Sequence, residues 1–353
     1  ISRRLIAFAS ALVGFIKGGL SMINIATSMF FAEISGSAVA DVAALGSILI
    51  PAMKKKGYPG AFSAAVTSSS ASLAIIIPPS IPMIVYAVMA QTSVVQLFVA
   101  GIIPGIIGGF LMMLAAYIYA VRHKLPVEET FNLANLRKTG REAALAFLLP
   151  FIILGGIFGG VVTATEGAGL AVVAALVIGL IYKEFDFKRL YQAATEGAIQ
   201  TASVMLLVAA SVLLGEFLTI EQIPQKVAES IIDFTKNKFA VLLILNVFLL
   251  IIGFFLHSVA AIILTVPIVM PLVNAVGIDP VHFGIIVTLN LAIGQQTPPV
   301  ASVLVTACSV AKADIWDVTR ANVMFICVLL FLLFLVTYVP AIPMTLVEFF
   351  YRS

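Results

Sequence analysis

Charged residues are scarce in this chain, and their scarcity excludes whole classes of protein. Asp, Glu, Lys and Arg together make up 10% of the 353 residues, whereas apolar residues make up 61%. A soluble domain is about 25% charged and roughly 45–50% apolar. Soluble enzymes, nucleic-acid-binding proteins and disordered scaffolds are therefore excluded, and the composition predicts an all-α polytopic membrane protein.

Cysteine and histidine are also scarce, with two and three copies. Cys308 and Cys327 both lie in apolar surroundings, so we expect two small core residues and no disulfide. The sequence has no His/Cys cluster with metal-ligand spacing, no Gly-x4-Gly-Lys-Ser/Thr phosphate loop and no Gly-x-Ser-x-Gly motif. These absences argue against an enzyme or an ATPase, and we expect no cofactor apart from coupling ions.

Glycine and proline, by contrast, are abundant for a helical membrane protein, with 25 and 16 copies. Two apolar stretches, 19–53 and 239–276, are too long for one straight span. At about 1.5 Å per residue such a helix would exceed roughly 50 Å, whereas the hydrocarbon core is about 30 Å thick. We therefore predict two re-entrant helical hairpins, which turn at the polar segments Ser35-Gly36-Ser37 and His257-Ser258.

Helix-breaking residues recur at a spacing of 220 residues, which indicates an internal repeat. The matched pairs are Pro51 with Pro271, Gly57 with Gly277, Pro78 with Pro298 and Pro79 with Pro299. Proline and glycine dictate backbone shape, so their shared register carries more weight than matches between apolar residues. Each half is predicted to be a hairpin followed by a helix that is broken at its Pro-Pro pair.

Basic residues collect on one side of the predicted topology. If the polar joints alternate between the two membrane faces, thirteen Lys and Arg residues share one side and four share the other. The thirteen are Lys54, Lys55, Lys56, Arg122, Lys124, Arg137, Lys138, Arg141, Lys183, Lys188, Arg189, Lys312 and Arg320, and the four are Lys226, Lys236, Lys238 and Arg352. The richer side is predicted to be cytoplasmic. The two hairpins then enter from opposite faces, as the inverted repeats of transporters do.

The breaks and the hairpin tips carry the chemistry that we expect. Consecutive prolines remove two backbone donors, so the carbonyl oxygens at each break are free of helical hydrogen bonds. Carbonyls and hydroxyls are hard ligands suited to sodium, and half-helix N-termini attract anions. Each half pairs one tip with one break, which predicts two sodium sites and one shared substrate site near the middle of the membrane.

Several polar residues keep more than one interpretation. Asp41 is an intramembrane carboxylate and therefore a functional candidate, with a structural pairing as the alternative, and Glu33 is evenly divided between the two. The run Ser68-Ser69-Ser70 could serve helix packing instead of a site. His257 could face the substrate, sense protons or be a satisfied core residue. Glu166 is predicted to cap a helix at an outer turn.

The ordered set of motifs resembles one known family over nearly the whole chain. The motifs are Gly36-Ser37-Ala38-Val39-Ala40-Asp41-Val42-Ala43-Ala44-Leu45-Gly46, Pro51-Ala52-Met53, Gly57-Tyr58, Ile77-Pro78-Pro79-Ser80 with Tyr86, Leu97-Phe98-Val99-Ala100-Gly101, Pro104-Gly105, Gly159-Gly160, Thr163-Ala164-Thr165-Glu166, Pro267 with Pro271, His282-Phe283-Gly284 and Thr297-Pro298-Pro299. They are similar to the large membrane subunit of tripartite ATP-independent periplasmic (TRAP) transporters. Relative to that family we expect an N-terminal portion to be missing, because the chain opens on Ile1.

The resemblance implies a multi-pass secondary importer of the bacterial inner (cytoplasmic) membrane, driven by sodium and moving its substrate by an elevator mechanism. The implied partners are a small membrane subunit, a soluble periplasmic substrate-binding protein, a small organic acid and the lipid bilayer, with no nucleic acid. The implied domains are an arm at 1–18, the transport-domain halves 19–91 and 239–312, a scaffold helix and cytoplasmic linker at 92–142, scaffold and arm helices at 143–238, and a C-terminal scaffold helix at 313–353.

The resemblance also implies roles for individual residues. One sodium site would comprise Ser35, Gly36, Ser37, Ile77, Pro78 and Ser80; the other would comprise Leu256, His257, Ser258, Gly294, Gln295, Thr297 and Pro298; and Asp41, Ser70, Ser72 and Gln296 would contact the substrate. The family often has an acidic residue where this chain has His257 and glycine where it has Ala301, so the second sodium site departs from the pattern.

The resemblance is greatest to the sialic-acid branch, which makes N-acetylneuraminate the expected substrate. A C4-dicarboxylate is the alternative within the family. An anion channel or a membrane subunit without sodium coupling is the alternative from another class.

Overall fold

The computed structural model describes residues 2–128, 130–182 and 186–351, and all regular elements in this part are helices. They are α1 (Ser2–Val13), α2 (Gly19–Ser35), α3 (Ala38–Asp41), a π-helical turn (Val42–Gly46), α4 (Ser47–Lys55), α5 (Gly60–Ala71), a 3-10 turn (Ser72–Ile75), α6 (Ile81–Met89), α7 (Val94–Arg122), α8 (Leu133–Phe158), α9 (Ala164–Ile181), α10 (Phe187–Ile220), α11 (Ile223–Phe234), α12 (Lys238–Phe255), α13 (Ser258–Ala275), α14 (Pro280–Gly294), α15 (Ser302–Ala311), α16 (Ile315–Tyr338) and α17 (Ala341–Tyr351). In the described chain, seven helices are long and apolar enough to span a membrane: α7, α8, α9, α10, α12, α13 and α16. The predicted all-α, polytopic class is confirmed.

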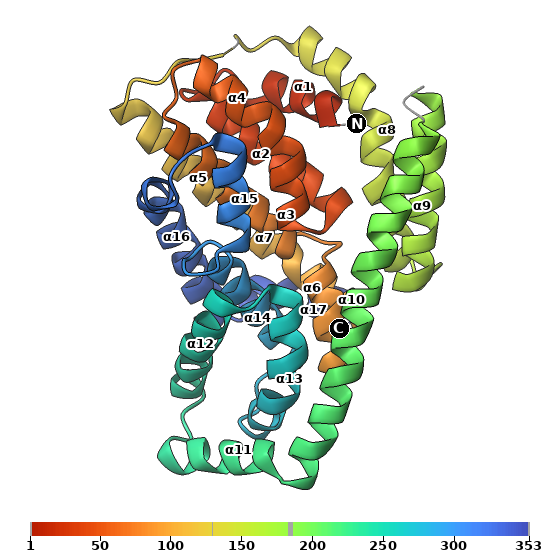
Figure 1. Cartoon of the computed structure of the whole chain (residues 1–353), viewed down its shortest axis with the longest axis vertical. Helices are drawn as coiled ribbons and strands as arrows, with labels where there is room; N and C mark the ends of the chain where they lie inside the picture. Colours follow the sequence, from red (N-terminus) through yellow and green to blue (C-terminus); the bar gives the residue numbers. More distant parts are fainter. Residues whose placement is uncertain (1, 129, 183–185, 352–353) are drawn as a thin grey trace.

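Both predicted hairpins form, and their tips approach each other from opposite ends of the molecule (Figure 1). In the first hairpin α2 ends at Gly36, whose φ of 62° lies in the left-handed region that glycine adopts without steric cost. Ser37 is extended, and α3, the π-helical turn and α4 form the returning arm. In the second hairpin, Leu256 and His257 are extended between α12 and α13.

Both helices with Pro-Pro pairs are broken as predicted. The first runs through α5 and its 3-10 turn, stops at Ile75 and resumes as α6 at Ile81. The second stops at Gly294 and resumes as α15 at Ser302. The Pro78-Pro79 and Pro298-Pro299 peptide bonds are both cis. Ala301 has a φ of 41°, a left-handed conformation that costs alanine about 1–2 kcal/mol and explains why glycine would fit this position.

The repeat continues beyond the matched prolines. The returning arms start at Ala38 and Ser258, and the broken helices start at Gly60 and Pro280, each pair being 220 residues apart. Gly57 and Gly277 both adopt left-handed conformations at the bases of the hairpins, with φ of 84° and 67°. The two lateral helices α1 and α11 occupy corresponding places before the hairpins, at opposite ends of the molecule in Figure 1. The two halves therefore repeat each other in sequence and lie in opposite orientations in space (Figure 1).

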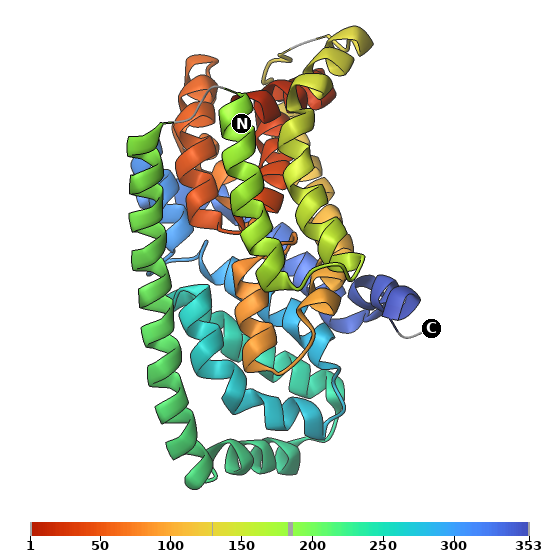
Figure 2. The same cartoon turned by 90° about the vertical axis from the view of Figure 1, so that its right-hand side faces the viewer.

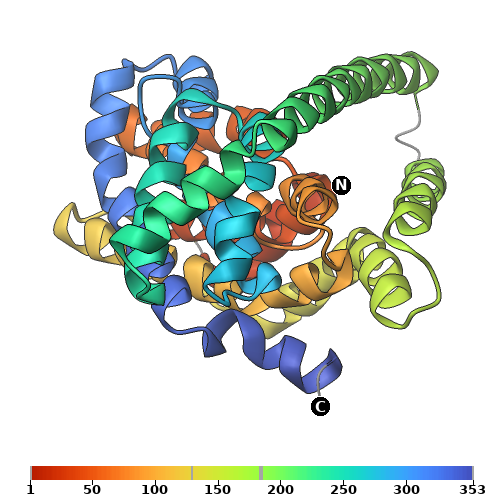
Figure 3. The ribbon, with the colours of Figure 1, turned by 90° about the horizontal axis from the view of Figure 1, so that it is seen from below.

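Helices α8, α9 and α10 lie at the edge of the core that the two repeats form, with α8 packed against α1. Helices α8 and α9 pack against each other, and Figure 3 shows α9 and the start of α10 set apart from the rest of the chain. Along the 190–218 span of α10 no side chain is buried, and Figure 2 shows this helix running along one side of the molecule. Apolar side chains exposed on such spans are those expected of helices that face lipid. Thr163 and Glu166 form the predicted cap of α9, with hydrogen bonds in both directions.

The two cysteines and the basic residues that predict orientation lie as follows in these helices. Both cysteines are free, as expected, but Cys327 is exposed, so its prediction as a core residue is wrong. It lies on a face of α16 that the rest of the chain does not cover. Of the basic residues used to predict orientation, Lys183 and Arg352 lie outside the described residues, and the side chain of Arg189 is not described.

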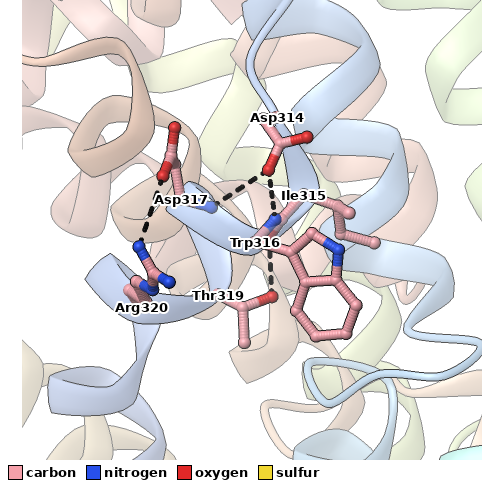
Figure 4. A network of polar contacts seen from close by, with 6 residues as sticks. All are labelled: Asp314, Ile315, Trp316, Asp317, Thr319 and Arg320. Carbon is pink, nitrogen blue, oxygen red and sulfur yellow. Dashed lines mark hydrogen bonds and ion pairs between the residues drawn. The ribbon is translucent and has the colours of Figure 1, made fainter.

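The start of α16 carries a polar network on the side predicted to be cytoplasmic (Figure 4). The Asp314 carboxylate accepts hydrogen bonds from the backbone N–H groups of Trp316 and Asp317, at 2.8 and 3.4 Å. Asp317 and Arg320 are 4.0 Å apart and both exposed. The network caps the first turn of a membrane-spanning helix, so it belongs to the boundary of the span.

Candidate functional site

The tip of the first hairpin is seated on the first break. The backbone N–H of Ile81 donates to the carbonyl oxygen of Gly36 at 3.5 Å. A Cβ atom on Gly36 would lie 2.9 Å from the carbonyl oxygen of Pro79, so no larger residue fits without displacing the break. A small cavity of about 90 Å³ lies at this junction, lined by Ile34, Ser35, Gly36, Pro79, Ser80, Ile81 and Ile84. Of the six residues assigned to the first sodium site, the structure brings Ser35, Gly36 and Ser80 to this cavity, whereas Ser37, Ile77 and Pro78 do not line it.

Asp41 places a fully buried carboxylate next to this tip. Its Oδ1 accepts a hydrogen bond from the Ser35 hydroxyl, and no protein partner is found for its Oδ2 among the described residues. The backbone N–H of Ser37 donates to the Ser35 Oγ at 3.2 Å, which fixes that hydroxyl in the turn. A buried carboxylate with one unpaired oxygen requires a proton or a cation to balance its charge. The tip therefore combines a buried carboxyl group with hydroxyl and carbonyl oxygens, a set of ligands suited to a hard cation when the carboxyl group is ionised.

The second tip contacts the second break along two glycines and one backbone hydrogen bond. A Cβ atom on Gly253 would lie 3.2 Å from the Cα of Gly294, and the N–H of Val300 donates to the carbonyl oxygen of Phe254 at 3.3 Å. Inside the break, Ser302 donates to the Oε1 of Gln295 at 3.3 Å. The Nε2 of buried Gln295 has no described partner. This break therefore holds one unsatisfied buried donor.

The remaining candidates of the second tip differ in exposure. Ser258 is buried at the start of α13, and Leu256 is half-buried. His257 is exposed, so the interpretation of His257 as a satisfied core residue is wrong. Thr297 and Pro298 are half-buried at the break, with the Thr297 hydroxyl donating to the carbonyl oxygen of Ile293 at 3.0 Å. An exposed imidazole at the tip is accessible to a ligand, whereas the Thr297 hydroxyl hydrogen is engaged within its own turn.

Both polar atoms of the Gln296 side chain are hydrogen-bonded within the protein. Its Nε2 donates to the carbonyl oxygen of Ser68 at 2.8 Å and to the hydroxyl of Ser72, and its Oε1 accepts from the Nδ2 of Asn322 at 3.3 Å. Asn322 in turn accepts a hydrogen bond of 2.5 Å from Ser69. All five residues are buried. Gln296 thus joins the second break to α5 of the first half and to α16.

Sequence reasoning missed Asn322 and the polar face of α2. Asn24 donates to Thr67 at 2.6 Å, and Ser28 shares a hydrogen bond of 2.9 Å with Ser70. These contacts show that the serine-rich α5 takes part in helix packing. An asparagine within an otherwise apolar helix was the available signal, because polar side chains at membrane depth face protein or a wet cavity.

A second tie runs from the first half to the second. The hydroxyl of buried Tyr86, on α6, donates to the carbonyl oxygen of Pro280 at 2.7 Å. A Cβ atom on Gly284 would lie 2.5 Å from the Tyr86 ring, so glycine is what lets α14 approach that ring. Each half therefore contributes one side chain, Tyr86 or Gln296, that donates a hydrogen bond to the backbone of the other half.

Comparison with known proteins gives one consistent family. Residues 1–342 match the family described as "Tripartite ATP-independent periplasmic transporter, DctM component". An isethionate TRAP transporter permease protein of Oleidesulfovibrio alaskensis is 42% identical over 98% of this chain and 54% of its own length. A C4-dicarboxylate TRAP transporter large permease protein of Pseudomonas aeruginosa is 39% identical, over 98% of this chain and 81% of its own length.

A sialic acid TRAP transporter large permease protein of Vibrio cholerae is 35% identical over 99% of this chain and 82% of its own length. The chain thus spans about half the length of the isethionate relative and about four fifths of the other two. The family match, the seven apolar helices and the inverted repeats agree with each other. The chain belongs to the DctM component family of TRAP transporters and is a multi-pass protein of the bacterial inner membrane.

Proposed function

We propose that this chain imports an organic acid by coupling its movement to the entry of sodium ions. A periplasmic binding protein delivers the substrate, and a small membrane subunit completes the complex. The observation that carries the proposal is the seating of each hairpin tip on a Pro-Pro break, with the buried carboxylate of Asp41 beside the first tip. Family membership supports the two partners, which the name "tripartite" implies.

The two sodium sites belong at the two junctions between tip and break. At the first, Ser35, Gly36 and Ser80 surround a cavity of about 90 Å³. One water occupies about 30 Å³ of liquid, so a partly hydrated sodium ion fits there, and Asp41 supplies the negative charge. At the second junction the ligands are carbonyl and side-chain oxygens of the break, with Ser258 at the start of α13. Asp41 thus serves the first ion in this proposal, in addition to bordering the substrate.

The two halves move as one block in this proposal. The hydrogen bonds from Gln296 to Ser68 and from Tyr86 to Pro280 cross between the halves in opposite directions, so neither half shifts alone without breaking buried polar contacts. Helices α8 to α10, which lie outside this block, supply the fixed side of an elevator. Breaking one of these buried hydrogen bonds without replacing it costs about 1–3 kcal/mol.

The substrate is an organic acid that carries a negative charge at neutral pH. The relatives are named for isethionate, C4-dicarboxylates and sialic acid, with identities of 42%, 33–39% and 35%. The isethionate relative is more similar to this chain than the sialic-acid relative, which favours a compact anion, with N-acetylneuraminate retained as the competing candidate. His257, exposed at the second tip, offers a hydrogen-bond donor to a carboxylate or sulfonate.

Uptake into proteoliposomes tests the proposal. Vesicles that contain the full membrane complex receive labelled succinate, isethionate or N-acetylneuraminate, with and without the binding protein and an inward sodium gradient. We expect one anion to accumulate only when both are present. Uptake that is independent of sodium and of the binding protein would indicate a channel or an uncoupled subunit and would overturn the proposal.

A further inference from the structure

A basic face stands apart from the transport block, on the first three turns of α8. The groove there has a volume of about 660 Å³, and the described residues that line it are Leu133, Ala134, Arg137, Lys138, Arg141 and Glu142. These positions form two neighbouring rows, each with a spacing of four residues, so they share one side of the helix. The groove therefore presents three cations and one carboxylate over a short distance.

The three cations are not neutralised by the part of the chain that the structure describes. No carboxylate there lies within 4.0 Å of Arg137, Lys138 or Arg141, and all three are exposed. Arg137 and Arg141 are four residues apart on a helix, a spacing at which like charges repel each other. Glu142 engages its backbone carbonyl with Arg4 at 3.4 Å and with the Tyr182 hydroxyl at 3.0 Å. An external anion would relieve the repulsion that the fold leaves in place.

The face lies where the helix passes from water into the bilayer. Glu142 is the last charged residue of α8, and the helix continues as an apolar segment to Phe158. Exposed apolar side chains flank the cations on both sides: Leu133 precedes them, and Leu148 and Phe151 follow, with Phe151 74% exposed. The charge placement puts this end of α8 on the cytoplasmic side, where anionic lipids attract clusters of Lys and Arg.

We propose that this face binds the phosphate headgroup of an anionic phospholipid. Arg137, Lys138 and Arg141 contact the phosphate, and the acyl chains lie along the exposed apolar side of α8 at Leu148 and Phe151. The groove is large enough for a headgroup, and the combination of cations with an adjoining apolar strip matches a lipid better than a soluble anion. This binding does not depend on the transported substrate.

Native mass spectrometry of the purified full chain tests this proposal, with phosphatidylglycerol as the probe and phosphatidylcholine as the neutral comparison. The R137Q/K138Q/R141Q variant is expected to retain at least tenfold less phosphatidylglycerol, because each basic residue near an anionic surface contributes a factor on the order of five. Retention of phosphatidylcholine is expected to be unchanged. Equal retention of phosphatidylglycerol by wild type and variant would overturn the proposal.

A matched control separates this face from general surface charge. The K55Q/R122Q/K124Q variant removes the same charge from the same predicted side, outside the groove, and is expected to retain phosphatidylglycerol at the wild-type level. If it loses as much lipid as the groove variant, the site is not specific. Glycerol 3-phosphate is added as a competitor, and displacement of the lipid at equal concentration would assign the face to a soluble phosphate instead.

The single variant R137Q keeps the test independent of folding. If the triple variant unfolds, R137Q is expected to show a several-fold loss of phosphatidylglycerol with an unchanged thermal unfolding midpoint. A single variant that folds normally and loses no lipid would also contradict the proposal.

Discussion

The side-chain amide of Gln296 donates a hydrogen bond of 2.8 Å to the backbone carbonyl oxygen of Ser68, although the two residues are 228 positions apart in the chain. Gln296 belongs to the break of the second half, and Ser68 belongs to α5 of the first. The contact is buried, and the Oε1 of the same amide accepts a hydrogen bond from the Nδ2 of Asn322 on α16. One side chain thus connects three segments that the sequence separates widely.

Gln296→Ala should destabilise the fold by roughly 2–3 kcal/mol, because it removes the acceptor of the buried Asn322 Nδ2 and the donor to the Ser72 hydroxyl. Thermal or denaturant unfolding in detergent micelles measures the change. Gln192→Ala, at an exposed position on α10, serves as the control and should change stability by less than about 0.5 kcal/mol. Equal stability of the two variants would show that the network contributes nothing.

Gly36→Ala should reduce sodium-driven uptake by about tenfold or more, a cost of about 1.4 kcal/mol in the transport step. The new methyl group would lie 2.9 Å from the Pro79 carbonyl oxygen and would force the tip away from the break. Gly57→Ala is the matched control, because Gly57 also has a left-handed φ, of 84°, but no atom within 4 Å of the added Cβ. Both variants carry the same kind of backbone cost, so only the difference between them reports on the contact. An equal loss of uptake in both variants would show that the contact between the first tip and the first break does not contribute to transport.

Asp41→Asn should raise the sodium concentration that gives half-maximal uptake by about tenfold, since it removes the one buried negative charge beside the first tip. The substitution keeps the shape of the side chain and a hydrogen bond with Ser35. Asp317→Asn changes an exposed carboxylate at the start of α16 and should leave the sodium dependence as it is. If Asp41→Asn lowers protein yield or stability while its sodium dependence matches wild type, Asp41 is structural.

The two hairpins and breaks should move together past the outer helices. Helices α10 and α13 contact each other here, so a cysteine on each, after replacement of Cys308 and Cys327 by serine, reports their relative position. The yield of the crosslink should change when sodium and substrate are added together. A crosslink yield that stays the same with and without sodium and substrate would contradict movement of the block relative to α10.

Much of this arrangement follows from local chemistry that a sequence displays. Gly36 and the two Pro-Pro pairs act on their own backbone, so the turn of the first hairpin and both breaks are found where the residues predict them. The 220-residue offset then places the second half, down to the left-handed Gly277.

The rest depends on which side of a helix meets another helix. Helix α16 is apolar almost all round, so its sequence does not tell that Cys327 points outward or which side chains Asn322 contacts. Gln296 has the polarity expected of a substrate ligand, and only its three hydrogen bonds show that it is engaged within the protein. The roles of individual polar residues therefore required the tertiary structure.

Sodium coupling is the central claim, and accumulation against a gradient tests it most directly. Proteoliposomes with the complete complex and its binding protein are given the labelled anion under an inward sodium gradient, in the absence of ATP. We predict that the internal concentration rises above the external one and falls back when a sodium ionophore collapses the gradient. Accumulation that survives the ionophore, or uptake that never exceeds the external concentration, would contradict the account.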